Sequence, residues 1–378
     1  MGRYAVVTED EGMDRVDRVK VRGEIELSEL GEDDYAAISA LIRGMDNTGS
    51  TQLNIRDKSP DYYRWMYQDN PAGRAVVYGA RHGGQLVASF AIAPKLMQVG
   101  GEVMLVGKTM DMFTSPDYQG LGLMSLCAQA AFDHAADRGI GLYYVTPSPN
   151  SYPIFLSKFH CREEFKVQYR ARMLDLGQLM RQLIRPVALG TTFAVLADRA
   201  RQLAGGLKHR ALPDGYSVEE SLAFGEAEET LWNQVSSSYS VATVRNASYL
   251  NWRYRDNPDT YRVFKLSSNR VLVGLVVVKR TVRRGLPVGE IVDYVCGRND
   301  DRTFGLLVQC AVQGLRDEGV AIAEAWTIPG TRQQKRFRAA GLWFPRAVNK
   351  FLLSPSALPP QFYVKHAWLL TLGDGNDV

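Results

Sequence analysis

The chain has 378 residues, of which 46% are hydrophobic and 23% are charged, as is usual for globular proteins. This length allows two domains of ordinary size, each with its own core. The formal net charge of +4 indicates only a mild attraction to anions. We expect no specific nucleic-acid partner, although the basic segment at 175–214 leaves nucleic-acid binding open.

The N-terminal segment shows no targeting signal. It is charged and lacks a long apolar core, which excludes a signal peptide, and Val6 replaces the Ser or Thr that myristoylation of Gly2 requires. The longest apolar stretches, about ten residues, are too short to span a bilayer. Four cysteines lie far apart without metal-binding spacing and indicate reduced thiols. We therefore expect a cytoplasmic protein with no transmembrane segment and no metal.

The first part of the chain predicts a leader and one mixed α/β domain. Residues 1–23 are polar and predict a flexible leader, and residues 24–174 form the first predicted domain. Acidic residues open its first helix, and Asn70-Pro71 ends the second. In chain order we expect a strand at 24–27, helices at 31–43 and 62–67, strands at 75–80, 85–93 and 103–113, a helix at 122–138, a strand at 141–146, a helix at 154–159 and a strand at 165–174.

Residues 175–214 predict a basic helical linker, since six Arg or Lys face one Asp between positions 181 and 210. Its apolar stretch 187–197 also suits a helix at a membrane surface, although Gly190 and two threonines interrupt it. A second domain at 215–355 repeats the order of the first, followed by a C-terminal tail at 356–378. Its predicted strands are 216–220, 261–266, 271–278, 289–296 and 321–327, and its predicted helices are 225–237, a short one at Trp252, and 304–318.

A repeated decapeptide supports the two-domain division. Residues 62–71 (YYRWMYQDNP) recur as 249–258 (YLNWRYRDNP), with six identical positions and an offset of 187 residues. An offset near half the chain indicates a duplicated domain. Trp65 and Trp252 are then core anchors of the shared scaffold. The expected fold is α/β, with two copies of a mixed, largely antiparallel sheet flanked by helices.

The segment that carries chemistry runs from Asp111 to Ser125. A strand ends, Pro116 turns the chain, and Gln119-Gly-Leu-Gly122 leads into the long helix. Glycines let backbone amides approach a ligand, and a helix N-terminus adds about half a positive charge. This pattern predicts a phosphate cradle. A dinucleotide fingerprint is disfavoured because Ser125 stands where a third small residue is required.

The loop Thr114-x-Pro-x-Tyr-Gln-Gly-Leu-Gly-Leu resembles the acyl-CoA loop of the GNAT (GCN5-related) N-acyltransferases, Gln/Arg-x-x-Gly-x-Gly/Ala. The order of elements around it is similar as well. Residues 148–159 resemble the segment of that family that follows its fifth strand. The motifs cover residues 24–174, whereas residues 215–352 share only the order of elements. The chain therefore resembles a tandem GNAT protein with a degenerate second domain.

The resemblance implies a binding site for acetyl-CoA or another acyl-CoA. Strand residues would pair with the pantetheine arm, loop amides would hold the pyrophosphate, and Asn150 matches an asparagine on the cofactor side. The strand residues are Met112, Phe113 and Thr114, and the loop residues are Gln119, Gly120, Leu121, Gly122, Leu123 and Met124. Two positions depart from the family: Met124 replaces Gly or Ala, and Leu156 replaces the Tyr that often protonates the thiolate.

Acyl transfer from a thioester needs a positioned amine, a group that accepts its proton, and stabilisation of the oxyanion. Asp111, on the fourth strand, is the candidate base, directly or through water. Its counterpart Asp293 in the copy without a cradle favours a purely structural role instead. Tyr152 and Tyr118 are candidates for the missing acid, although most tyrosines simply pack with the hydroxyl satisfied.

The second copy lacks the cradle, because Cys296-Gly-Arg-Asn-Asp-Asp-Arg-Thr-Phe-Gly305 replaces it and Asp300-Asp301 would repel a pyrophosphate. We expect an N-acyltransferase acting on a small amine or amino sugar, with catalysis in the first domain. The alternative is a non-catalytic acyl-CoA sensor or scaffold. A tRNA-dependent aminoacyl transferase of related fold is disfavoured by the intact cradle. Whether two copies form a homodimer stays open.

Overall fold

The structure is a computed structural model that describes residues 24–46, 58–183, 211–354 and 359–375. The chain divides into two compact units, residues 1–94 with 107–141 and residues 95–106 with 142–378. The predicted leader at 1–23 and most of the predicted linker, residues 184–210, lie outside the described residues.

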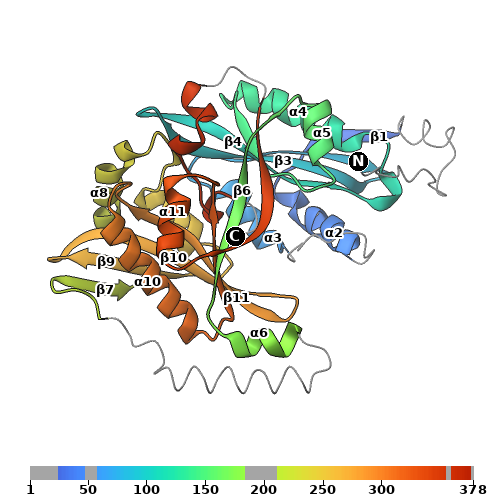
Figure 1. Cartoon of the computed structure of the whole chain (residues 1–378). Coiled ribbons are helices and arrows are strands. Elements are labelled where there is room, and N and C mark those ends of the chain that lie inside the picture. The colour runs from blue at the N-terminus through green and yellow to red at the C-terminus, as the bar shows by residue number, and fades with distance from the viewer. Residues whose placement is uncertain (1–23, 47–57, 184–210, 355–358, 376–378) are drawn as a thin grey trace, which may run out of the picture. The chain divides into compact units, whose positions relative to one another are not determined.

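The first unit contains a sheet with helices on both faces. Its strands follow the order β1-β2-β3-β4, and β2 pairs antiparallel with both β1 and β3. Figure 1 shows α4 on one face of this sheet and α2 and α3 on the other. The described elements that begin in this unit are β1 (Ile25–Glu29), η1 (Glu32–Asp34), α2 (Tyr35–Asp46), α3 (Pro60–Tyr63), η2 (Arg64–Gln68), β2 (Val76–His82), β3 (Gln85–Val99), η3 (Pro116–Tyr118) and α4 (Leu123–Asp137). Strand β4 (Glu102–Thr114) enters it from the second unit.

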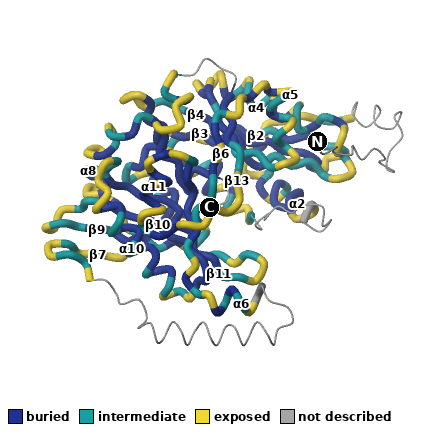
Figure 2. Tube along the Cα trace, in the orientation of Figure 1, coloured by how far each residue is buried: buried dark blue, intermediate teal, exposed yellow. Residues whose placement is uncertain are grey.

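Strand β3 is the central strand of this core. Its residues from Leu86 to Pro94 are buried without interruption, which is expected when both faces of a strand are covered. Figure 2 shows this buried centre in dark blue, with exposed positions in yellow. Phe90 packs edge-to-face against Phe132 of α4, with ring centroids 5.3 Å apart. The apolar runs that predict the strands therefore also form the core.

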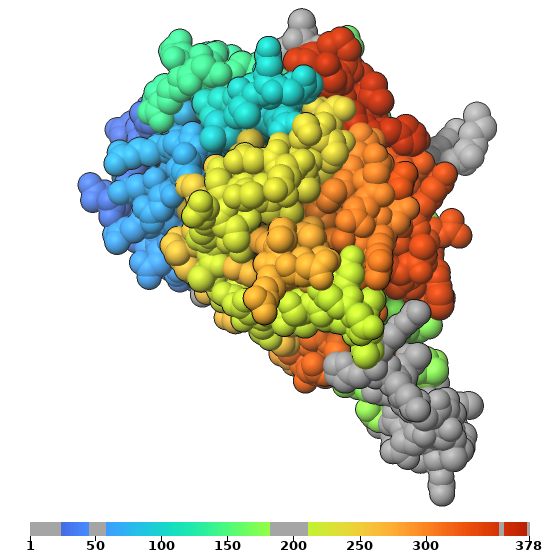
Figure 3. Space-filling view, turned by 90° about the vertical axis from the view of Figure 1, so that its left-hand side faces the viewer, coloured from blue at the N-terminus to red at the C-terminus, as the bar shows by residue number. Residues whose placement is uncertain are grey.

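The second unit carries a longer sheet in the order β5-β13-β6-β12-β11-β10-β9-β7. Among the described residues of this sheet, β11 and β12 pair in parallel and the other neighbouring strands pair antiparallel. Figure 3 shows residues 211–220, which include the edge strand β7, beside β9 on the surface. The described elements are β5 (Tyr143–Val145), α5 (Tyr152–Ser157), β6 (Arg162–Met173), α6 (Leu176–Leu183), β7 (Tyr216–Glu220), α8 (Glu226–Val235), η4 (Ser236–Ser238), β8 (Val241–Thr243), α9 (Ala247–Leu250), η5 (Asn251–Arg255), β9 (Arg262–Ser268), β10 (Val271–Arg283), β11 (Leu286–Cys296), α10 (Asp301–Asp317), β12 (Ile322–Thr327), α11 (Arg332–Ala339) and β13 (Phe344–Leu353).

The two copies of the duplication exchange their last strands. Strand β13 of the second copy pairs with β5 of the first, and β6 of the first pairs with β12 of the second. The exchanged strands also pair with each other, and Phe165 stacks on Phe351 with ring centroids 4.6 Å apart. The predicted α/β class with a largely antiparallel sheet is confirmed, but the two copies share one sheet in this unit.

The repeated decapeptide folds in the same way in both copies. Ser59 and Asn246 cap short helices by accepting hydrogen bonds from the amides of Tyr62 and Tyr249. Each helix continues into one π-helical turn, η2 or η5. Such turns are rare in proteins, and many of those that occur lie at functional sites. Trp65 and Trp252 are 3% and 5% exposed, in agreement with their predicted role as core anchors.

The C-terminal segment is folded where the structure describes it. It contains η6 (Pro360–Tyr363), η7 (Lys365–Ala367), β14 (Trp368–Leu369) and η8 (Leu372–Asp374), and β14 pairs parallel with β8. The indole of Trp368 donates to the carbonyl of Phe362 at 3.0 Å. This packing brings Asp374 into the core of the second unit, at 2% exposure.

Asp374 belongs to a buried charge network around Arg245. The Arg245 guanidinium donates to Asp293 and to Asp374, each at 2.9 Å, and all three side chains are at most 2% exposed. Burial opposes ionisation of Asp374, but the charges of Arg245 and Lys95 outweigh it and hold the pKa of that carboxyl below its usual value. Removing one partner from such a network costs about 3–5 kcal/mol.

Lys95 lies beside this network. Its ammonium reaches the carbonyl of Gly373 at 3.5 Å and is buried among Arg245, Arg253, Asp293 and Asp374. Burial lowers the pKa of Lys95 to about 7, helped by the two arginines and opposed by the two carboxylates. Without Lys95 those four charges already balance, so a proton on Lys95 adds an uncompensated buried charge.

We predict that the free energy of unfolding rises with pH above neutrality. Between pH 7 and the ordinary lysine value of 10.5, the unfolded chain binds a proton that folded Lys95 does not. The slope should approach about 1.4 kcal/mol per pH unit. Urea unfolding at pH 7, 8 and 9 checks this. Lys95→Met should flatten the dependence, and equal slopes in both proteins would contradict the prediction.

Candidate active site

The predicted cradle is a loop that two left-handed glycines shape. After β4 the chain makes the 3-10 turn η3, and Gly120 and Gly122 then adopt φ values of +78° and +76°. Gly122 caps α4, and a Cβ atom built there meets nothing within 4 Å. Backbone conformation, rather than lack of space, therefore makes glycine necessary at this position.

The loop presents its amides without internal partners. Within the described residues, the amides from Gly120 to Met124 make no hydrogen bond, whereas the amide of Gln119 donates to Pro116 at 3.2 Å. Five of the six predicted donors are thus available at the N-terminus of a fifteen-residue helix. The buried side chains of Leu121 and Leu123 anchor this loop to the core. The arrangement suits an anionic group such as a pyrophosphate.

Met112, Phe113 and Thr114, predicted to pair with pantetheine, form the last three residues of β4 and are partly exposed. The side-chain amide of Gln119 donates back to the carbonyl of Thr114 at 3.4 Å. This contact ties the strand end to the cradle. The two predicted binding segments are therefore continuous in the first unit.

Asp111 is the centre of a cluster of three side chains. Its Oδ2 accepts from the hydroxyl of Tyr67 at 2.7 Å, and its Oδ1 accepts from Lys58 Nζ at 2.5 Å. The carboxylate side chain is 3% exposed and Lys58 is 14% exposed. Burial and the neighbouring Asp111 charge raise the pKa of Tyr67 far above its usual value, so Tyr67 remains a donor.

The backbone at Asp111 is strained. Its φ of +50° lies in the left-handed region, which is uncommon for a residue other than glycine. Strain of this kind costs about 1–3 kcal/mol and is frequent at active sites. The hydroxyl of Ser89 donates to the Asp111 carbonyl at 3.3 Å and helps to hold this conformation.

The second copy repeats the cluster with Arg245, Tyr254 and Asp293. Tyr254 donates to Asp293 at 2.7 Å, as Tyr67 does to Asp111. Lys58 and Arg245 have the same sequence offset of 187 residues as the two tyrosines. The cation of this cluster was not among the residues predicted from the sequence. Extending the repeat four residues upstream would have found it, since both cations directly precede a helix-capping residue.

The two copies differ in what surrounds the cluster. In the second copy, Thr371 and Asp374 of the C-terminal segment bind Arg245, at 3.1 and 2.9 Å, and close the network. The cradle is also replaced. Asp300 caps α10 by accepting from the amide of Thr303 at 2.9 Å, so its own side chain takes a donor that an anion would need.

The two candidate acids lie in different units. The hydroxyl of Tyr118 is hydrogen-bonded to Nδ1 of His82 at 2.9 Å in the first unit. Tyr152 belongs to the second unit, where it donates to Glu163 at 2.5 Å and Lys350 lies 3.3 Å from its ring centroid. The Tyr152 hydrogen bond is the main cause that lowers the pKa of Glu163. Asn150 is exposed in the turn before α5 of the same unit.

A comparison with known protein families supports the prediction made from the glycine loop. The model of the acetyltransferase (GNAT) domain family matches residues 33–159, which include β4, the cradle and α4. The first part of the chain is a GNAT-type acetyltransferase domain. No curated protein sequence matches the chain.

Solved structures share the fold over most of the chain. A probable N-acyltransferase from Enterococcus faecalis V583 has a TM-score of 0.58 at 13% identity, covering 87% of this chain and 72% of that one. N-myristoyltransferase from Saccharomyces cerevisiae with bound myristoyl-CoA has a TM-score of 0.60 at 10% identity, covering 88% and 82%. A tandem GNAT protein from the clavulanic acid biosynthesis pathway has a TM-score of 0.57 at 16% identity, covering 88% and 100%. At these identities the likeness shows the fold, and the tandem GNAT fold predicted from the sequence is confirmed.

Acyl-CoA is accordingly the co-substrate class of this protein.

Among the described residues, no group of three or more His, Cys, Asp or Glu has a geometry that would hold a metal ion. No helix within those residues is long and apolar enough to cross a membrane.

We predict that Gly122→Ala weakens acyl-CoA binding at least about tenfold, or 1.4 kcal/mol. Alanine is strained at φ +76°, so the loop must shift and move its amides. Gly139→Ala is the matched control, because Gly139 has φ +80° and open space at the other end of the same helix. Both changes should lower stability by about 1–2 kcal/mol. Calorimetry should detect weaker binding only for Gly122→Ala, and equal affinities would contradict the cradle.

Proposed function

We propose that the protein transfers an acyl group from acyl-CoA to the amine of a small molecule or an amino sugar. The observation that carries this proposal is the loop from Gly120 to Met124, with its two left-handed glycines and its available amides at the start of α4. Only the first copy has it, so catalysis is assigned to the first domain. Acetyl-CoA is the proposed donor because the matching family model is that of an acetyltransferase domain.

Transfer is proposed to be direct, without a cysteine intermediate. Burial raises the pKa of Cys127 to about 12 and those of Cys161, Cys296 and Cys310 to about 11. All four thiols therefore stay protonated at neutral pH, and a protonated thiol is a poor nucleophile. No disulfide joins them, which supports the proposal of a cytoplasmic, reducing compartment.

Asp111 is proposed to accept the proton of the acceptor amine. An acceptor ammonium has the same charge and the same hydrogen-bond donors as the Lys58 group that now contacts Oδ1. Exchange of Lys58 for the substrate would place the reacting amine against the carboxylate, while Tyr67 keeps Oδ2 fixed. Tyr118 and Tyr152 remain proposals for the acid that protonates the leaving thiolate, and each acts only if it leaves its present partner.

The reaction is tested by thiol release. We expect CoA to appear when acetyl-CoA is mixed with a panel of amines and amino sugars, and not without an acceptor. Longer acyl-CoAs in the same assay define the acyl preference. Acyl-CoA binding by calorimetry without thiol release for any acceptor would favour the alternative, a non-catalytic sensor. Sedimentation of the same sample decides whether a homodimer forms.

We predict that Asp111→Asn lowers kcat/KM about 10²- to 10⁴-fold, because the amide cannot accept the proton. Asp293→Asn is the matched control, since Asp293 has the same tyrosine and cation partners but no cradle. It should lower the unfolding temperature and leave the rate per folded molecule unchanged. If both variants lose only stability, Asp111 has a structural role and is not the base.

A further inference from the structure

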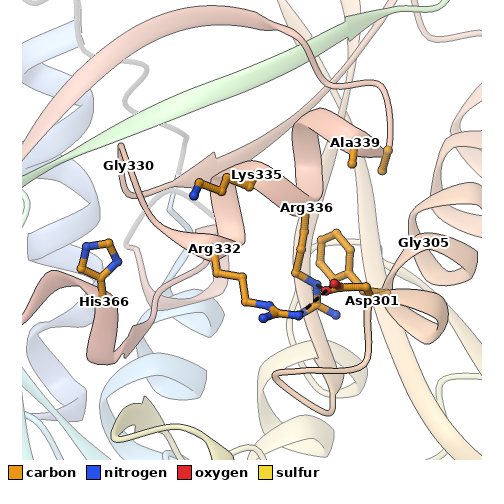
Figure 4. Close-up of a pocket in the computed structure, with 10 residues that line it drawn as sticks. Asp301, Gly305, Gly330, Arg332, Lys335, Arg336, Ala339 and His366 are labelled. Atoms are coloured by element: carbon orange, nitrogen blue, oxygen red, sulfur yellow. Dashed lines mark hydrogen bonds and ion pairs between the residues drawn. The ribbon is translucent and has the colours of Figure 1, made fainter.

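A pocket of about 670 Å³ lies between the start of α10 and helix α11 in the second unit. Figure 4 shows its lining, to which α11 contributes Arg332, Lys335 and Arg336. His366 lies on the opposite wall. Lys365 also approaches the pocket, because a Cβ atom at the lining residue Gly330 would be 3.3 Å from its Nζ. Cationic groups thus enter the pocket from two elements.

One carboxylate, Asp301, is found among these lining residues. It pairs with Arg332 at 2.8 Å and with Arg336 at 3.2 Å. Lys335 extends from α11 away from Asp301 (Figure 4) and has no ion-pair partner within the described residues. The three positively charged side chains of α11 in the lining outnumber the one carboxylate and leave the pocket with a cationic excess.

Arg336 gives the pocket a fixed, buried cation. It is 8% exposed, and its guanidinium donates to the carbonyls of Arg298 at 3.1 Å and Asp300 at 2.6 Å. It also lies 4.0 Å from the ring centroid of Phe304. Its buried Nε faces Asp301 without hydrogen-bond geometry, so one donor remains unsatisfied. The fixed positive charge of this buried guanidinium, together with the excess of cations around it, favours an anionic ligand.

The remaining wall limits the kind of anion. Phe304, Gly305, Ala339 and Ala340 provide an apolar surface next to the charged groups. A phosphate monoester carries a charge of about −1.5 to −2 and three acceptor oxygens, which match an arginine fork and a lysine. A volume of this size suits a small organic ligand. We propose that the second domain binds a small phosphate ester in this pocket, with its phosphate held by Arg332 and Lys335.

The groups proposed to bind the anion here differ from those of the cradle in the first copy. There, backbone amides at a helix N-terminus are available for the anion, whereas at α10 the side chain of Asp300 already caps the helix. In the second copy, recognition instead depends on side chains of α11. The glycine loss that removes one kind of anion site is therefore accompanied by a cationic helix of the sequence RQQKRFRA.

Calorimetry on the full chain with phenyl phosphate as probe tests the site. Binding with a Kd below about 1 mM is expected. Lys335→Gln should weaken it at least tenfold, and Arg338→Gln is the matched control, because it removes one charge from the same helix outside the pocket lining. Both residues are exposed, so both variants should fold, and their melting temperatures verify this.

Two variants test whether the pocket of the second domain is independent of the first domain. Gly122→Ala should leave phenyl phosphate binding unchanged, since the cradle lies outside this pocket, and Lys335→Gln should leave acyl transfer unchanged. Benzoate, which carries a carboxylate on the same ring, should bind more weakly than phenyl phosphate. The site is refuted by absence of binding at 5 mM probe, about five times the expected limit for Kd, or by equal losses in Lys335→Gln and Arg338→Gln, which would indicate diffuse attraction to α11.

Discussion

A carboxylate on the fourth strand of each copy, held between a cation and a tyrosine hydroxyl, links the repeated helix to the sheet. Asp111 binds Lys58 and Tyr67, and Asp293 binds Arg245 and Tyr254. A buried charge is costly unless it is paired and hydrogen-bonded, so both partners must be positioned together. The capped helix with its π-helical turn achieves this positioning, which explains why its aromatic residues and its capping position recur in both copies.

The same cluster has different surroundings in the two copies. In the first copy, Asp111 lies on the strand that leads into the glycine loop. The backbone of Asp111 is strained, and Lys58 is partly exposed. In the second, the C-terminal segment contributes Asp374 and Thr371 and buries the cluster completely. A paired and enclosed carboxylate such as Asp293 stabilises the fold, whereas the strained and less enclosed Asp111 is the one proposed to act in catalysis.

The exchange of β6 and β13 joins the two copies into one sheet in the second unit. Local sequence does not predict it, because β6 reads as an ordinary last strand whichever copy it pairs with, and β13 was not predicted as a strand. Strand β8, the C-terminal turns and the pairing of β14 were missed for a similar reason. These elements are two to four residues long and are fixed by packing against distant parts of the chain.

The sequence by itself determined the duplication, the α/β class, most helices and strands, and the glycine loop as the candidate place for acyl-CoA. Each of these follows from local signals: periodicity, capping, turn residues and glycine dihedral freedom. The tertiary structure alone decided which cation meets Asp111, that Asp374 closes the second cluster, and that Arg332, Lys335 and Arg336 line a pocket. Lys58 meets Asp111 and Asp374 meets Arg245 across long stretches of chain, and the pocket brings α11 against the start of α10, so these contacts depend on packing rather than on any local pattern.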